Sequence, residues 1–325
     1  MKYGTIPGVD GGKKVSRIAQ GLMVLREDHE EFGFELLDAV YAAGVTLFDS
    51  AQIYGGGACD RVFGKWARQR GIREQIVLMD KCSHHSRDRR RVTPFDVTAD
   101  LHDCLARLQF EYVDIFAFHR DDESQPVGPL VERLNQHIDE GRIRAYGASN
   151  WTHRRIAEAV EYAEARGLVP MAVSSPHYSL AECTADPWGG GSVSITGEAG
   201  AEARAWYARA QMAILPWSSL SGGFFSGRFR RDDLDGFTDG ADARCVRCYC
   251  CEDNFRRLDR AAELAAEKGL SLAQIALAWC ISGELNVFPL MAAWTVEQAA
   301  QNGAAGDVEL TAAEVAWLNL EADSR

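Results

Sequence analysis

Four titratable side chains lie close to the ends of short apolar runs, in a pattern that suits proton transfer. Asp49, Lys81 and His119 each close or follow such a run, and Tyr54 lies five residues after Asp49. A free tyrosine has a pKa of about 10, too high for easy proton release near neutral pH, and a neighbouring ammonium lowers it. Asp49 can keep Lys81 charged and in place. Tyr54 is therefore a candidate proton donor, and His119 can orient a substrate oxygen.

The elements that must position these residues are short apolar runs alternating with helical periodicity. Continuous apolar strands are typical of a parallel sheet, which is buried on both faces. A run at residues 18–24 is either the first barrel strand or part of an N-terminal hairpin. About eight strand–helix units favour an α/β fold, a closed (β/α)8 TIM barrel, as a single domain over residues 1–325. The other predicted strands are residues 46–49, 75–79, 113–118, 143–148, 171–174, 212–216 and 287–290.

Helix start and stop signals lie between these runs. Thr93, followed by proline, predicts a helix N-terminus, and Gly141 is placed to end the next helix. Ser271 and Thr311 each begin a capping-box pattern. Residues 181–200 are long, irregular and glycine-rich and follow the sixth predicted strand. In a barrel, such a loop lies at the end where the four titratable residues would meet.

Composition excludes several classes of protein. The chain has 325 residues and a formal net charge of −12, and an acidic balance argues against nucleic-acid binding. No apolar run approaches the roughly 20 residues of a membrane span, and the first residues do not read as a signal peptide. Nine cysteines is an odd number for a disulfide scaffold. We expect a cytoplasmic protein with reduced thiols and no nucleic-acid or membrane partner, and its oligomeric state is open.

Several of these segments resemble the aldo-keto reductase superfamily. FDSAQIYG at residues 48–55, Lys81, and the pair at residues 118–119 are similar to the family signature. GRIRAYGASN at residues 141–150 resembles the fifth-strand motif, and residues 217–228 resemble the seventh-strand cofactor loop. The resemblance runs from about residue 15 to residue 320. It implies a (β/α)8 barrel that transfers hydride between a nicotinamide and a carbonyl or alcohol, with Tyr54 as the acid in reduction and the base in oxidation.

The resemblance also implies a cofactor, NADP(H), with NAD(H) as an alternative. Ser149 and Asn150 match the family's carboxamide ligands, and Ser175 stands where the family usually has glutamine. Trp217 matches the aromatic residue that stacks on the nicotinamide. The positions that match pyrophosphate or adenine contacts are Ser219, Leu220, Gly222, Gly223, Arg228, Gln298 and Asn302.

One position departs from the family pattern. Many relatives place a basic residue shortly after the last strand, where it pairs with the 2′-phosphate of NADP. Here Trp294 stands near that position. Tryptophan cannot pair a phosphate dianion as arginine does, so the sequence leaves the preference between NADP and NAD open.

Four cysteines form a local group at Cys245, Cys248, Cys250 and Cys251. A zinc or iron–sulfur site needs its thiolates arranged around one centre, which two adjacent cysteines on a short segment would struggle to provide. We therefore predict no metal and interpret residues 245–251 as a surface loop entering the helix that holds Leu258. A metal or redox protein is the alternative that this group leaves open.

Substrate contacts are weakly indicated. His85 and Arg120 follow Lys81 and His119, and Trp188 lies in the long loop, although loop packing and loop ion pairs explain them equally well. The polar loops favour a sugar or polyol carbonyl, and nearby aromatic residues also permit an aromatic aldehyde. The leading hypothesis is an enzyme, an NAD(P)-dependent carbonyl reductase or alcohol dehydrogenase. The alternative is a dinucleotide-binding regulatory barrel of the channel β-subunit type with little turnover.

Overall fold

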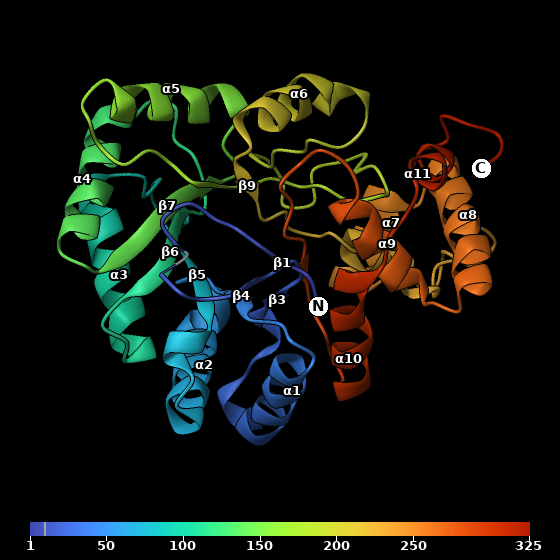
Figure 1. Cartoon of the computed structure of the whole chain (residues 1–325), viewed down its shortest axis with the longest axis horizontal. Helices are drawn as coiled ribbons and strands as arrows, with labels where there is room; N and C mark the ends of the chain where they lie inside the picture. The colour runs from blue at the N-terminus through green and yellow to red at the C-terminus, as the bar shows by residue number, and fades with distance from the viewer. Residues whose placement is uncertain (10) are drawn as a thin grey trace.

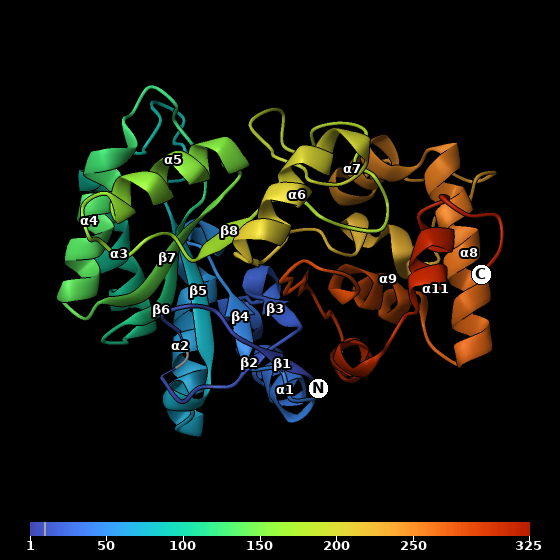
Figure 2. The ribbon, with the colours of Figure 1, turned by 45° about the horizontal axis from the view of Figure 1, so that its top comes forward.

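A parallel eight-stranded sheet lies at the centre of the computed structural model, which describes residues 1–9 and 11–325 (Figures 1 and 2). The run at residues 18–24 supplies the first strand of this sheet, β3, and not part of the hairpin that precedes it. The strands of the sheet are β3 (Ala19–Gly21), β4 (Leu47–Asp49), β5 (Val77–Cys82), β6 (Val113–Phe118), β7 (Ile143–Ser149), β8 (Val173–Ser175), β9 (Ala213–Ile214) and β10 (Leu290–Met291).

The two ends of the sheet meet and close the barrel. The strand order is β10-β3-β4-β5-β6-β7-β8-β9. From β3 to β9 the strands follow one another in chain order, and the last strand, β10, lies beside the first, β3. The amide of Phe288 donates to the carbonyl of Ile214 at 2.7 Å, and the amide of Leu290 donates to that of Pro216 at 3.1 Å. These bonds join β9 to the segment that enters β10. The predicted (β/α)8 barrel is confirmed.

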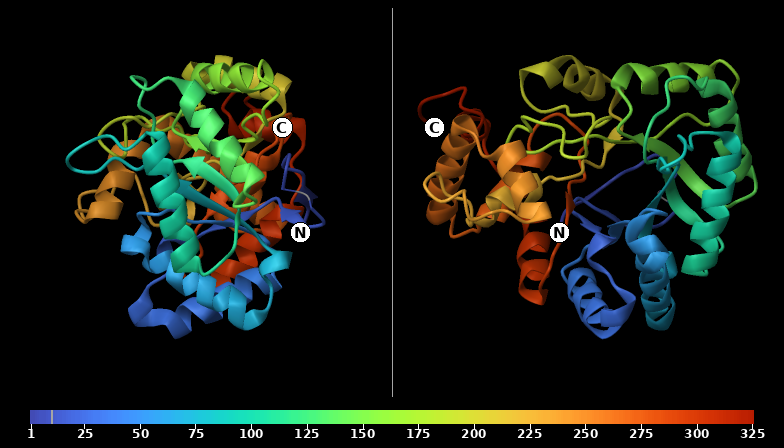
Figure 3. Two further views of the ribbon diagram at one scale, coloured as in Figure 1. Left: turned by 90° about the vertical axis from the view of Figure 1, so that its left-hand side faces the viewer. Right: turned by 180° about the vertical axis from the view of Figure 1, so that it is seen from behind.

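Helices surround the strands in both views of Figure 3. Short 3-10 helices connect several elements, and two of them, η3 (Tyr54–Gly57) and η6 (Ser221–Ser226), follow barrel strands at the site end. The α-helices are α1 (Glu30–Ala42), α2 (Ala58–Arg70), α3 (Pro94–Leu108), α4 (Val127–Asp139), α5 (His153–Glu164), α6 (Ala201–Ala210), α7 (Gly240–Tyr249), α8 (Glu252–Lys268), α9 (Leu272–Ile281), α10 (Val296–Ala304) and α11 (Ala312–Leu318).

The predicted capping signals are confirmed. The Thr93 side chain accepts a hydrogen bond from the amide of Asp96 at the start of α3. Ser271 and Thr311 each form a complete capping box, at α9 and α11. Gly141 follows the end of α4 with a φ of +70°, a conformation that glycine adopts without strain. Polar side chains at these points satisfy amides that a helix leaves unpaired.

The interior of the barrel is filled by alternate residues of the strands. Leu47, Val77, Met79 and Ile115 belong to one buried cluster. Residues of the N-terminal segment, among them Ile6, join the same cluster. This segment contains an antiparallel hairpin, β1 (Tyr3–Gly4) with β2 (Val15–Ser16), and β1 lies across the middle of the barrel in Figure 1. The hairpin therefore covers one end of the barrel with apolar side chains, at the end opposite the carboxyl ends of the strands.

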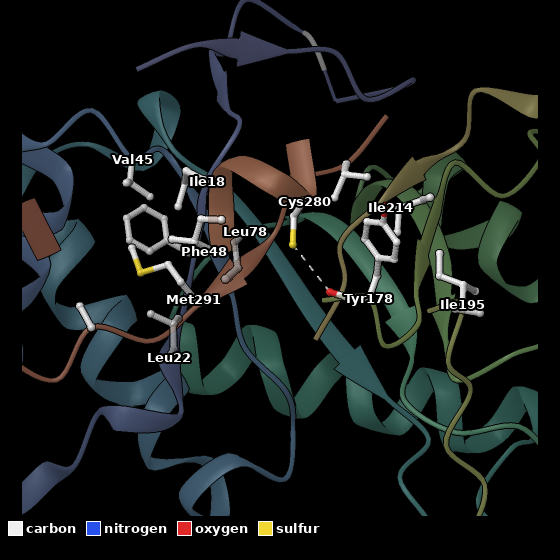
Figure 4. Close-up of a cluster of buried hydrophobic side chains, with 14 of the residues drawn as sticks. Ile18, Leu22, Val45, Phe48, Leu78, Tyr178, Ile195, Ile214, Cys280 and Met291 are labelled. Carbon is white, nitrogen blue, oxygen red and sulfur yellow. Dashed lines mark hydrogen bonds between the residues drawn. The ribbon is translucent and has the colours of Figure 1, made fainter. Parts of the chain in front are cut away.

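A second and larger apolar layer lies between the strands and the helices. Figure 4 shows part of it, with Phe48, Leu78 and Met291 in one group and Tyr178 and Cys280 in another. Phe48 and Leu78 are directly paired across β4 and β5 and are both fully buried. Because neighbouring residues of a strand point to opposite faces, each strand supplies both layers, which explains why the strands are continuously apolar in sequence.

Helix length and hydropathy bear on whether a segment could cross a membrane. In the part of the chain that the structure describes, no single helix is long and apolar enough to cross a membrane. Helices α8 and α9 pass that test only when they are taken together, and they are bent by 101° relative to each other.

Gly64 on α2 provides a test of the close packing between α2 and α3. A Cβ atom at this position would lie 2.2 Å from the carbonyl oxygen of Leu108, and backbone cannot move aside as a flexible side chain can. We expect Gly64→Ala to lower the free energy of unfolding by about 1–3 kcal/mol, measured by urea denaturation. Gly240→Ala is the matched control, because a Cβ there meets nothing within 4 Å. Equal stability of the two variants would contradict the packing.

Candidate active site

The four titratable residues lie at the ends of three neighbouring strands and in one connection. Asp49 ends β4, Lys81 is the penultimate residue of β5, His119 directly follows β6, and Tyr54 begins η3. Asp49 is paired with Met79, whose side chain faces the barrel interior. Lys81 lies two residues further along β5 and therefore points to the same side. The strand pairing thus brings the Asp49 and Lys81 side chains together at the inner edge of the barrel mouth.

The ammonium of Lys81 is the centre of this group. It is almost fully buried and donates to the carboxylate of Asp49, to the carbonyl oxygen of Ser50 at 2.7 Å and to the hydroxyl of Tyr54 at 3.4 Å. Sequence reasoning did not identify Ser50 as a partner, because its contact uses a backbone oxygen and carries no signal of residue type. The three contacts fix the position of the ammonium between the carboxylate and the phenol.

Burial and charge act against each other on the ion pair. Burial disfavours the charged lysine, but the carboxylate of Asp49 and the oxygen of Tyr54 outweigh it and raise the pKa of Lys81 above its usual value. Burial raises the pKa of Asp49, and Lys81 opposes that rise. Lys81 therefore keeps its positive charge at all physiological pH values.

The hydroxyl of Tyr54 keeps its proton more firmly than the sequence suggests. Burial raises the pKa of Tyr54 to about 12, and the charge of Lys81 offsets only part of this rise. The expectation that Lys81 lowers this pKa is right in direction for that one interaction but wrong for the net value, because desolvation of the phenolate is the larger effect. Tyr54 is accordingly a protonated donor near neutral pH.

His119 stands beside the phenol as a neutral ring. Its ring meets that of Tyr54 edge to face, with centroids 5.7 Å apart. Burial, followed by the charge of Lys81, lowers the pKa of His119 well below its usual value. Its Nδ1 atom is buried and has no hydrogen-bond partner among the described residues. The ring of His84, a few residues after Lys81, packs against His119 at 4.8 Å between centroids.

The residues expected to bind a nicotinamide carboxamide lie at the ends of β7 and β8. The Oγ of Ser175 is buried without a hydrogen-bond partner among the described residues, which leaves it available to a ligand. Ser149 donates to the carbonyl of Ser175 at 2.8 Å. Asn150 accepts from the indole of Trp217 at 3.1 Å and from the amide of Val193 at 3.2 Å, and so fixes the ring that was expected to stack on the nicotinamide.

The predicted pyrophosphate loop is the segment around η6. Gly222 and Gly223 have φ values of +63° and +96°, which glycine tolerates, and a Cβ on Gly223 would meet nothing closer than 4.0 Å. Ser219 is buried, and its hydroxyl donates to the carbonyl of Pro216. Arg228 makes two hydrogen bonds to Asp242, at 2.9 and 2.8 Å. A phosphate at Arg228 would have to share the guanidinium with this carboxylate.

The residues expected near the adenine end differ in exposure. Trp294 is 61% exposed and its amide donates to the side chain of Gln298 at 2.8 Å. Gln298 is also exposed, and α10 begins directly after Thr295. Asn302 is buried and its amide nitrogen lies against the sulfur of Met291 at 3.6 Å. The indole of Trp294 is thus an exposed and uncharged surface just before α10.

The three predicted substrate residues have different surroundings. His85 contacts the carbonyl of Asp121 at 3.1 Å. Arg120 has a buried Nη1 atom without a hydrogen-bond partner in the described part of the chain. Trp188 is 47% exposed on the long loop, with the guanidinium of Arg244 over its ring at 4.4 Å.

The cysteine-rich segment is mostly helix, so its interpretation as a surface loop was wrong. Cys245 and Cys248 lie in α7 and are buried, and Cys250 directly follows that helix. The Asp239 side chain caps the helix by accepting from the amide of Asp242. The thiol of Cys245 donates to the carbonyl of Ser221 at 3.5 Å, so α7 packs on the predicted cofactor loop.

The sequence model of the Aldo/keto reductase family matches residues 17–319. The chain belongs to the aldo/keto reductase family. Two relatives illustrate its range. A protein from Oryza sativa subsp. japonica named "Probable voltage-gated potassium channel subunit beta" is 28% identical over 312 residues, covering 91% of this chain and 89% of the relative. The "Uncharacterized oxidoreductase YrpG" of Bacillus subtilis (strain 168) is 26% identical over 321 residues, covering 95% and 92%.

Solved aldo/keto reductase structures share the fold. An aldo-keto reductase from Klebsiella pneumoniae in complex with NADPH superposes with a TM-score of 0.73 at 22% identity, covering 100% of this chain and 97% of that one. Another from the same organism, in complex with NADP and acetate, gives 0.71 at 22% identity, with 96% and 93% covered. The thermostable aldo-keto reductase Tm1743 gives 0.73 at 20% identity, with 99% and 100% covered.

The ion pair at the centre of this aldo/keto reductase site predicts a pH-dependent stability loss. Lys81→Met leaves the Asp49 carboxylate buried without its cation, which typically costs about 3–5 kcal/mol. Burial then raises the pKa of Asp49 further above its unfolded value of about 4, so the variant retains stability at low pH and loses it as pH rises. Urea unfolding at about pH 5 and about pH 8 measures the difference.

The double variant Lys81→Met/Asp49→Asn is the control for this measurement. It removes both charges, so we expect it to recover part of the stability at the higher pH. A cost for Lys81→Met that does not change with pH, or a double variant no more stable than the single one, would contradict the pairing.

Proposed function

We propose that the chain is an NADP(H)-dependent reductase of aldehydes or ketones that also runs in reverse as an alcohol dehydrogenase acting on CH–OH. The observation that carries the proposal is the Lys81 ammonium held between Asp49 and the hydroxyl of Tyr54. Family membership supports the reaction class. Sugar or polyol carbonyls are the candidate substrates, because polar loops border the mouth.

Each of the four site residues has a separate role in the proposed proton transfer. As a carbonyl is reduced, negative charge develops on its oxygen, which needs a proton donor and electrostatic support. Tyr54 gives its proton to that oxygen, and Lys81 stabilises the phenolate that remains. Asp49 holds Lys81 in place. The neutral ring of His119 donates a hydrogen bond that orients the carbonyl. In alcohol oxidation, the Tyr54 phenolate takes the proton back.

The donor set fits a nicotinamide dinucleotide. The free Oγ of Ser175, together with Ser149 and Asn150, would hold the carboxamide, and Trp217 would lie against the ring. The open backbone at Gly222 and Gly223, with the amides of Ser219 and Leu220, would hold the pyrophosphate with Arg228. Gln298 and Asn302 would border the adenine. When bound, the nicotinamide supplies or accepts the hydride. NADP and NADPH complexes of two structural neighbours support this cofactor.

The remaining assignments are part of the same proposal. His85, Arg120 and Trp188 would contact the substrate, the first two from connections after strands and the third from the long loop. We place the protein in the cytoplasm, and its nine free cysteines fit a reducing compartment.

A second candidate function is a dinucleotide-binding regulatory subunit with little turnover. The 28% identity to a protein named as a probable potassium channel β subunit favours it. The two functions separate in one assay, because a reductase turns over a simple aldehyde such as 4-nitrobenzaldehyde with NADPH. Dinucleotide binding without measurable turnover would favour the regulatory subunit.

Tyr54→Phe tests the proton donor. The ring stays in place and the proton is lost, so we expect kcat for carbonyl reduction to fall by about 10² to 10⁴-fold. Dinucleotide binding, measured by fluorescence titration, should remain. A variant that kept more than about a third of the wild-type kcat would remove Tyr54 from this role.

Trp294 predicts weak discrimination between the two reduced cofactors. Strong NADP selectivity generally needs a cation, and preferably a forked arginine, on the 2′-phosphate. Arg231, which lies shortly after the predicted cofactor loop and could otherwise supply such a cation, is already paired with Glu252 and Asp259. We expect kcat/KM for NADPH and NADH to differ by less than about 100-fold, which corresponds to about 2.7 kcal/mol. Steady-state kinetics at matched ionic strength decide the matter, and a preference above roughly 1,000-fold would contradict it.

A further inference from the structure

Two buried carboxylates, Asp60 and Asp80, lie close together behind the predicted active site. Asp60 lies near the start of α2, and Asp80 directly precedes Lys81 in β5. Because side chains alternate along a strand, Asp80 points away from the barrel interior and into the layer between strands and helices. Both residues are fully buried. Ligand atoms of Asp60, Asp80 and the Cys104 thiol of α3 all lie within 4.8 Å of one another.

Each carboxylate has one satisfied oxygen and one unsatisfied oxygen. The hydroxyl of Ser50 donates to Oδ1 of Asp60, and the amide of Lys81 donates to Oδ1 of Asp80 at 2.7 Å. Both Oδ2 atoms are buried without a hydrogen-bond partner among the described residues. Two ionised carboxylates in this arrangement would repel each other and leave two acceptors empty.

The cations around the pair are engaged elsewhere. Arg107 of α3 approaches Asp60 Oδ2 only to 4.0 Å and donates instead to the carbonyl of Gln52 at 2.7 Å. Arg61 of α2 pairs with Glu27 at 2.6 Å.

The remaining groups that face the pair act on the pKa of Asp80 in both directions, although burial has the largest effect and raises it. The Cys104 thiol and the charge of Lys81 lower this pKa, and the charge of Asp49 raises it. The ammonium of Lys81 on β5 turns to Asp49 on β4. Burial raises the pKa of the nearby thiols Cys59 on α2, Cys82 on β5 and Cys104 on α3, so they stay uncharged.

We propose that Asp60 and Asp80 share one proton, as a carboxylic acid hydrogen-bonded to a carboxylate, and that this pair positions Lys81. A single proton between the two free oxygens satisfies both and removes the repulsion. Burial, with the neighbouring carboxylate as the next cause, raises the pKa of Asp60, and burial raises the pKa of Asp80. Both raised pKa values agree with a proton shared between the two carboxylates.

The pair reaches Lys81 by two routes. Asp80 holds the backbone amide of Lys81, and Asp60 holds the hydroxyl of Ser50, whose carbonyl accepts from the Lys81 ammonium. Asp60 and Asp80 are therefore positioning residues, because neither contacts Tyr54. The inference rests on the proposed function only for the role of Lys81.

Stability against pH tests the shared proton without any turnover. A carboxyl whose folded pKa lies above its unfolded value of about 4 stabilises the folded state at low pH, and that contribution is lost as pH rises. Asp60→Asn mimics the protonated acid permanently. We expect its Tm relative to wild type to rise by at least about 2 °C between about pH 5.5 and about pH 8.5. A difference that is the same at both pH values would overturn the proposal.

Asp114→Asn is the matched control. Asp114 is also fully buried, but Lys13 and Arg73 approach its carboxylate to 2.6 and 2.9 Å. We expect no relative gain at the higher pH for this variant. A gain equal to that of Asp60→Asn would show that any loss of a buried carboxylate has this effect, and would overturn the proposal. So would one metal ion per chain in elemental analysis of dialysed protein.

The positioning role is tested by kinetics. Asp60→Ala removes the acceptor for Ser50, and we expect kcat for carbonyl reduction to fall by about tenfold or more while dinucleotide affinity stays within about threefold. Asp60→Asn should recover most of the loss. If Asp60→Ala does not fold, Ser50→Ala breaks the same route and should lower kcat similarly. Equal kcat for the Ala and Asn variants, or a wild-type kcat in Ser50→Ala, would overturn the positioning role.

Discussion

The buried ammonium of Lys81 constrains the architecture around it. A charge taken out of water is costly unless it is paired and hydrogen-bonded, and here the oxygens come from β4 and from the residues that follow it. Parallel pairing of β4 with β5 sets Asp49 opposite Met79 and so places Lys81 one inward step further. A shift of one residue in this register would turn Lys81 into the helix layer and bring Asp80 to the mouth. The register between β4 and β5 therefore determines whether the Lys81–Asp49 pair can form.

The same alternation explains how much of the fold could be predicted from the sequence. Phe48 packs in the helix layer and Met79 in the barrel interior, so the strands carry apolar residues on both faces, which indicates a parallel sheet. Thr93 and Ser271 mark helix starts because their hydroxyls cap the helix amides. Closure of the barrel is predicted differently, from the number of strand–helix units and from the family resemblance, because no local pattern marks it. It depends on backbone bonds such as that from Phe288, which any residue type can make.

Other features depend on contacts between distant segments, and the sequence carried little signal for them. Cys245 and Cys248 suggested a surface loop, but their spacing places both on one side of α7, which packs on the segment around Ser221. Asp60 on a helix and Asp80 on a strand are 20 positions apart in sequence, and only the fold brings their carboxylates within 4.8 Å. Net pKa values are equally non-local, because they depend on how deeply each group is buried.

Burial sets three protonation states at the site in a consistent way. It raises the pKa of Tyr54 to about 12 and lowers that of His119, so both groups are neutral hydrogen-bond donors near neutral pH. Lys81 is the exception, because the carboxylate of Asp49 and the oxygen of Tyr54 outweigh burial there and keep the ammonium charged. The result is a protonated phenol beside a positive charge, which is the arrangement that the proposed proton transfer requires.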